Sequence, residues 1–111
     1  MPEMHFTIQW PNGKRERCYS PSYVIEEYLT PGEAYPVPEF LKRTGEALEL
    51  ASERVRQRYG FACSSALDQL RELSETSQAL TSAEREGTVQ VLAFEKHPPR
   101  NARAKTEEPS Q

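Results

Sequence analysis

The turn Pro11-Asn12-Gly13 is the feature that most constrains the fold, because it fixes how two flanking strands pair. Proline presets φ near about −65° for the first turn position, asparagine tolerates the second, and glycine accepts positive φ. These preferences predict a three-residue hairpin loop with a G1 bulge. In the resulting register Cys18 points into the core, on the sheet face that also carries Met4, Phe6, Ile8 and Trp10.

A two-residue type I′ turn at Asn12-Gly13 is the alternative. It shifts the pairing by one residue and moves Cys18 to the opposite face. Proline in the flanking strand position disfavours this turn. We therefore expect the first register. In it, Lys14 and two arginines lie on the second strand, at the edge of the sheet, where their charges disfavour pairing with another chain. The face away from the core is then polar and basic, and comprises His5, Thr7, Gln9, Arg15, Arg17 and Tyr19.

Two helices are expected next along the chain. Ser20 is a good N-cap and Pro21 a good first helical residue, which predicts a short helix over 21–29. The proline-rich segment EAYPVP should be extended. After it a long helix is predicted, with Gly60 as a left-handed stop. Its apolar stripe recurs at three- and four-residue steps through Phe40, Leu41, Thr44, Ala47, Leu48, Ala51, Val55 and Tyr59.

A third helix and a closing strand complete the predicted domain. The helix begins near Ser65, which has capping-box spacing to Asp68. The segment TVQVLAF, 88–94, is rich in β-branched and aromatic residues and predicts a strand. From residue 97 onward there is no large apolar side chain. Residues 97–111 are therefore expected to form a disordered, solvated tail after a single domain over 1–96.

These elements predict an α+β fold in the order β-β-α-α-α-β. A sheet needs a third strand to be stable, so the closing strand should pair beside the first. The expected architecture is a three-stranded, mainly antiparallel sheet of strand order 2-1-3, packed on one face by the helices. A chain of 111 residues provides one such domain with a modest core.

Composition excludes several classes of partner and compartment. The formal net charge is −3, with 14 basic and 17 acidic residues, so there is no electrostatic reason to expect nucleic acid or an anionic membrane as partner. The longest apolar run, Val91 to Phe94, is far too short to span a bilayer, and the start MPEMHF has no export pattern. We expect a cytoplasmic protein whose two cysteines stay reduced.

Few residues suggest catalysis or cofactor binding. Cys63 lies just before the third helix, where helix amides favour a thiolate, and is the candidate reactive thiol. His5 is the one ordered histidine that could lie within hydrogen-bond reach of this thiol. In the expected register His5 points away from the core, so no catalytic dyad is expected. Cys18, Cys63, His5 and His97 lack zinc-ligand spacing, and no phosphate-binding glycine motif occurs. The sequence predicts no catalytic residue, metal or cofactor.

Aromatic and basic side chains around the hairpin suggest an interface instead. Tyrosine, tryptophan and arginine are enriched at protein interfaces, although core packing explains many of these aromatics equally well. The candidate interface residues are Trp10, Arg15, Arg17, Tyr19 and Tyr23.

Three long segments resemble one family. The runs MPEMHFTIQWPNG, ERCYSPSYVIEEYLTPGEAYPVPEFL and ASERVRQRYGFACSSALDQL are similar to small bacterial nitrogen-starvation response proteins encoded in gene clusters around a group 1C nitrilase. The resemblance covers residues 1–95. It implies a cytosolic protein that accompanies a nitrilase, a radical SAM protein, an acetyltransferase, a flavin oxidoreductase and a glycosyltransferase. It supplies no catalytic residue.

Two functions from different classes follow. The first is a non-catalytic accessory or adaptor protein that binds an enzyme from the same cluster, or a second copy of itself, through the hairpin surfaces. The second is a small metabolite-binding protein or enzyme that uses a pocket between the hairpin and the long helix, with Cys63 as reactive thiol. A transcriptional regulator is disfavoured by the acidic balance and by the lack of a basic recognition helix.

Overall fold

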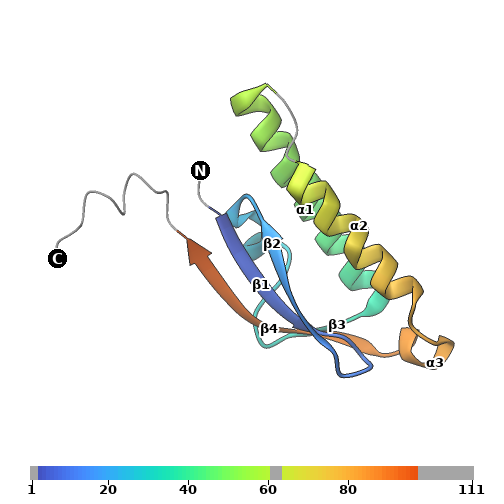
Figure 1. Ribbon diagram of the computed structural model, residues 1–111. Helices are drawn as coiled ribbons and strands as arrows, with labels where there is room; N and C mark the ends of the chain where they lie inside the picture. The colour runs from blue at the N-terminus through green and yellow to red at the C-terminus, as the bar shows by residue number, and fades with distance from the viewer. Residues whose placement is uncertain (1–2, 61–63, 98–111) are drawn as a thin grey trace.

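The protein forms two layers, with helices on one face of an antiparallel sheet (Figure 1). The structure, a computed structural model, describes residues 3–60 and 64–97. Helices α1 and α2 lie side by side across the sheet and run in opposite directions. In chain order the elements are β1 (Glu3–Gln9), β2 (Arg15–Ser20), the 3-10 helix η1 (Tyr23–Glu27), β3 (Ala34–Pro36), α1 (Val37–Tyr59), α2 (Ser64–Gln78), α3 (Ser82–Arg85) and β4 (Thr88–His97).

The hairpin register is confirmed. The backbone N–H of Trp10 donates to the carbonyl of Lys14 at 2.8 Å, and Gly13 has a φ of 90°. This is the left-handed glycine that the three-residue loop requires. Phe6 is paired with Cys18, and Cys18 is fully buried. The turn chemistry therefore determined which face of the hairpin enters the core.

The sheet has four strands, in the order β2-β1-β4-β3, so the predicted three-stranded sheet is one strand short. The closing strand does lie beside β1, as expected, and pairs antiparallel with it. The extra strand, β3, comes from the segment that was expected only to be extended. It pairs through Tyr35 with Val89 of β4. Pro36 is tolerated in it because β3 is an edge strand, which has no neighbour on its outer side.

β4 continues three residues past the predicted strand end and includes His97. Its pairing with β1 shifts between Thr7 and Ile8, where a β-bulge leaves Leu92 opposite no single partner. Beyond the bulge His5 is paired with Glu95. Val91 and Phe94 are three residues apart and would point to opposite faces of a regular strand. Because of the bulge, both lie on the same side of the sheet as Ile8 and Phe6.

The three predicted helices are present in the predicted order, with corrected starts, and a short fourth helix, α3, was not predicted. The first is a 3-10 helix over Tyr23–Glu27 that is capped by Ser22, because Ser20 still belongs to β2 and its hydroxyl donates to the Ser22 carbonyl at 2.8 Å. The long helix ends at Gly60, with φ 88°, as predicted. Ser65 lies inside α2 and cannot cap it. The capping box occurs instead at α3, between Thr81 and Glu84.

The core lies between the sheet and the two long helices. Trp10 packs edge-on against Phe40 of α1 at 5.8 Å between ring centroids, and its indole N–H donates to Glu16 at 2.9 Å. Leu70 of α2 lies over Gly45 of α1, where the two helices approach closely. The largest fully buried side chains include Phe6, Met4, Ile8, Ile25, Leu29, Leu48, Leu73, Val89 and Val91. Within the described ranges, no helix combines the length and hydrophobicity needed for a membrane span.

Candidate functional site

Among the residues that the structure describes, no helix covers one face of the sheet. Successive strand residues point to opposite sides, so the residues between the buried positions lie on the face opposite the one that packs against α1 and α2. These residues are half-buried or exposed. We call this surface the open face; it comprises His5, Thr7, Gln9, Arg15, Arg17, Tyr19, Glu95 and His97. Its β1 and β2 members are the polar face that the sequence predicted.

An ion pair spans the open face from one strand to another. The Arg17 guanidinium of β2 donates two hydrogen bonds to Glu95 of β4, at 3.0 and 2.9 Å. Hydrogen bonding within this pair raises the pKa of Arg17 and lowers that of Glu95. Alongside it the Arg15 guanidinium donates to Gln9 at 3.1 Å. Because the bidentate pair is exposed, it adds little to stability, but it holds both charges in defined positions.

The two histidines of the chain meet on this face. His5 Nδ1 and His97 Nε2 share a hydrogen bond of 2.9 Å between β1 and β4. The His5 ring also makes an edge contact with the Tyr19 ring, at 5.7 Å between centroids. Partial burial, followed by the charges of Arg17 and His97, lowers the pKa of His5. The lowered pKa favours the uncharged form of His5, in which one of the two rings can donate and the other accept.

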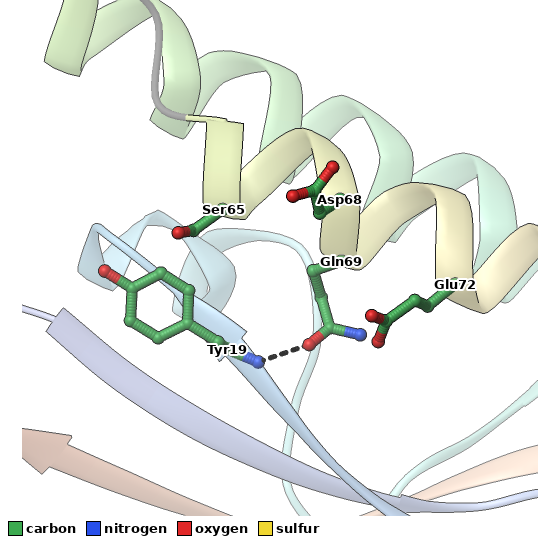
Figure 2. Close-up of a pocket in the computed structure, with 5 residues that line it drawn as sticks. All are labelled: Tyr19, Ser65, Asp68, Gln69 and Glu72. Atoms are coloured by element: carbon green, nitrogen blue, oxygen red, sulfur yellow. Dashed lines mark hydrogen bonds between the residues drawn. The ribbon is translucent and has the colours of Figure 1, made fainter.

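A pocket lies at the edge of the open face, between β2 and α2 (Figure 2). Its volume is about 300 Å³. The ring of Tyr19 forms one side, so this residue borders both the pocket and the open face. The polar groups of α2 that line the remainder are Ser65, Asp68, Gln69 and Glu72. The two charged residues of the lining are both acidic, which favours cationic or hydrogen-bond-donating ligands.

Gln69 occupies the inner part of this pocket and is 9% exposed. Its Oε1 accepts the backbone N–H of Tyr19 at 2.9 Å (Figure 2). β2 is an edge strand, so this N–H points away from β1 and would otherwise lack a strand partner. The Nε2 of Gln69 is buried and has no acceptor among the described residues. Gln69 thus provides an acceptor for one backbone N–H at the edge of β2, while its own Nε2 donor remains unsatisfied.

Gln69 is a site residue that was not predicted from the sequence, although the sequence carries a signal for it. Gln69 follows Ala66 by three residues and precedes Leu73 by four, so it falls on the buried stripe of α2. A polar residue on such a stripe needs a hydrogen-bond partner when it is buried. The partner is a backbone group of β2, whose position next to α2 is a feature of the tertiary structure.

Replacing Gln69 with leucine should lower the free energy of unfolding by about 1–3 kcal/mol, because the N–H of Tyr19 would lose its acceptor without gaining another. Urea denaturation followed by circular dichroism would measure the change. Gln78→Leu is the matched control, since Gln78 ends the same helix and is exposed. Equal stability of the two variants would contradict the role assigned to Gln69.

The structure separates the five predicted interface residues. Arg15, Arg17 and Tyr19 lie together on the open face. Trp10 is 2% exposed and belongs to the core. Tyr23 lies in η1, on the opposite side of the sheet, where the Lys96 ammonium sits 5.3 Å from its ring centroid.

The two cysteines also differ. Cys18 is buried, and burial raises the pKa of its thiol, with smaller contributions from the carboxylates of Glu16 and Glu72. Its environment is thus unsuited to thiolate chemistry. Cys63, the candidate reactive thiol, lies outside the described residues. In the part of the chain that the structure describes, no three His, Cys, Asp or Glu side chains are grouped so as to hold a metal ion.

Comparison with known proteins places the chain in a family. Searches of curated proteins and of solved structures gave no match. A family model described as "Nitrogen starvation-induced protein NitG" matches residues 5–94, which span the sequence from β1 to β4. Because this match covers well over half of the chain, the protein belongs to the NitG family of nitrogen starvation-induced proteins.

Proposed function

We propose that this protein is a non-catalytic accessory protein of a nitrilase-linked nitrogen-starvation pathway, which binds one of the pathway's enzymes in the cytoplasm through the open face. Membership of a nitrogen starvation-induced family supports the setting. The link to a nitrilase rests on the sequence resemblance. The observation that carries the binding role is the open face itself, a sheet surface that presents linked polar side chains away from both long helices.

Two properties make this face more suitable for binding than an ordinary solvated sheet surface. Arg17, Glu95, His5 and His97 are already held by hydrogen bonds to one another, so they lose less conformational freedom when a partner docks. Arginine and tyrosine are enriched in interfaces, and Tyr19 lies beside this group. The face carries both positive and negative charges. This favours a partner whose surface has opposite charges at the matching positions.

A pull-down from cells grown under nitrogen limitation tests this proposal. The full-length tagged chain should recover an enzyme of the pathway, and Arg17→Glu should reduce the recovered amount by about tenfold or more, because it opposes Glu95 and reverses a charge on the open face. Arg58→Glu is the matched control: the charge change is the same, but Arg58 is exposed in the last turn of α1, away from the sheet.

The double variant Arg17→Glu with Glu95→Arg separates binding from folding. It can re-form the ion pair within the chain while inverting the charge pattern that a partner meets. We expect thermal stability close to that of the wild type and no recovery of binding. If the wild-type chain recovers no pathway enzyme, or if only copies of the chain itself are recovered, the proposal is wrong. Full binding by Arg17→Glu would also exclude the open face.

A second candidate function, a small metabolite-binding protein, is favoured by the pocket between β2 and α2. Its buried Gln69 Nε2 lacks an acceptor, and its charged lining residues are acidic. A small cation that carries a carbonyl oxygen would match both features. The pocket adjoins α2 rather than the long helix α1 that the sequence analysis expected.

Glycinamide is a suitable probe for this pocket, with propionamide as the neutral control. Saturable shifts of the Gln69 side-chain NH₂ resonances with glycinamide, much reduced in Glu72→Gln, would support the pocket. Unchanged resonances would exclude it. The proposed reactivity of Cys63 is tested separately by its alkylation rate against pH, and a rate equal to that of the denatured chain would remove that proposal.

A further inference from the structure

The contact between the two histidines has a geometry that suits metal binding. His5 Nδ1 and His97 Nε2 face each other at 2.9 Å on neighbouring strands, 92 positions apart in the chain. Both rings are half-buried on the open face, within reach of solvent. The pairing of Glu3 with His97, and of His5 with Glu95, places these four residues at one end of the β1–β4 ladder.

The charges around the pair are of both signs. Arg17 opposes a positive charge near His5, as its effect on the pKa of His5 shows. However, its guanidinium is bound by both carboxylate oxygens of Glu95. Glu3, opposite His97 on the neighbouring strand, adds a second carboxylate on the same face. The carboxylates of Glu95 and Glu3 therefore offset part of the effect of Arg17 on a positive charge at His5.

The separation of the ring nitrogens indicates which ions fit. A metal–imidazole bond is about 2.0–2.1 Å long, so two nitrogens 2.9 Å apart subtend an angle of about 90° at a shared ion. That angle belongs to neighbouring positions of square-planar or octahedral coordination. A tetrahedral ion would require a separation of about 3.3 Å. If the two nitrogens keep this separation when the rings turn toward an ion, the spacing favours Cu²⁺ or Ni²⁺ over Zn²⁺ without movement of the strands.

We propose that His5 and His97 form a two-imidazole binding site for a divalent transition-metal ion of the Cu²⁺ or Ni²⁺ type, with water in the remaining positions. Binding requires the proton between the rings to move to the other nitrogen of its own ring. Each ring then turns so that its free nitrogen points to the ion. The site goes beyond the proposed accessory function and does not depend on a protein partner.

Isothermal titration of the full-length chain with Ni²⁺ at pH 7 tests the site. We expect saturable 1:1 binding, weakened about tenfold or more by either His5→Gln or His97→Gln, because each turns a chelating pair into a single ligand. Thr7→Gln is the matched control on the same face and should bind as the wild type does. In NMR spectra Ni²⁺ should broaden the imidazole signals of both histidines together.

The same variants define the results that would overturn the proposal. If His97→Gln retains full affinity, the ion is held by His5 with other groups, such as the chain's amino terminus. If Cys63→Ser abolishes binding, a thiol holds the ion. Absence of saturable binding to the wild type also rejects the site. Circular dichroism of each variant confirms that a loss of affinity does not arise from unfolding.

Discussion

Trp10→Ala should reduce the free energy of unfolding by about 3–5 kcal/mol, since it removes one of the largest buried side chains of the protein. The indole ring packs edge-on against Phe40, and its N–H is the donor to Glu16, so the substitution leaves both a cavity and an unpaired carboxylate. Urea denaturation monitored by circular dichroism measures the loss. For a domain of this size such a loss is a large share of the total stability.

The Trp10 result also decides between two roles for this residue. If Trp10 were a surface contact, its replacement would leave stability nearly unchanged and reduce partner binding. Leu67→Ala is the control, because Leu67 is 44% exposed on α2 and should change stability by less than about 1 kcal/mol. A Trp10→Ala protein that is as stable as Leu67→Ala would show that the core differs from the structure described above.

Cys18 should be almost unreactive while the protein is folded. In a Cys63→Ser variant, where Cys18 is the only thiol, we expect iodoacetamide to react about 10³-fold or more slowly than in the urea-denatured chain. The side chain is fully buried and its Sγ faces the carbonyl of Glu16, so reaction must wait for the chain to open. Rates measured at increasing urea concentrations should rise in step with unfolding.

The pH dependence of stability gives an independent check on Cys18. Burial raises the pKa of this thiol in the folded state above its ordinary value of 9.0. As the pH rises through that value, the unfolded chain releases the thiol proton while the folded chain retains it. The free energy of unfolding should therefore fall with rising pH, and Cys18→Ala should remove this part of the decline. Rapid alkylation of the folded protein would show that Cys18 faces solvent.

The predictable parts of the fold depend on local rules. Pro11-Asn12-Gly13 determined the hairpin register, and with it the burial of Cys18, because turn type fixes which residues stand opposite each other. The stripe from Phe40 to Val55 and the stop at Gly60 determined α1. The open face followed directly from that register, so Arg15, Arg17 and Tyr19 were placed correctly together.

The features that were not predicted from the sequence depend on contacts between residues that are distant in the sequence. Residues 34–36 became a strand because β4 offers a free edge, which their own composition does not indicate. Trp10 already lay on the core face in the predicted register, so only its assignment to the interface failed; in the structure it is buried against Phe40 of α1. Gln69 accepts the Tyr19 N–H only because α2 lies beside the edge of β2.

By itself, therefore, the sequence determined the hairpin, the two long helices and the side of the sheet on which each hairpin residue lies, since steric and turn preferences act over a few residues. The tertiary structure decided the fourth strand, the pocket at Gln69 and the meeting of His5 with His97. Those features require β4, the last strand, to pair with β1, the first, and α2 to lie beside β2. Pairings between segments so far apart depend on the packing of the whole core, which no local pattern specifies.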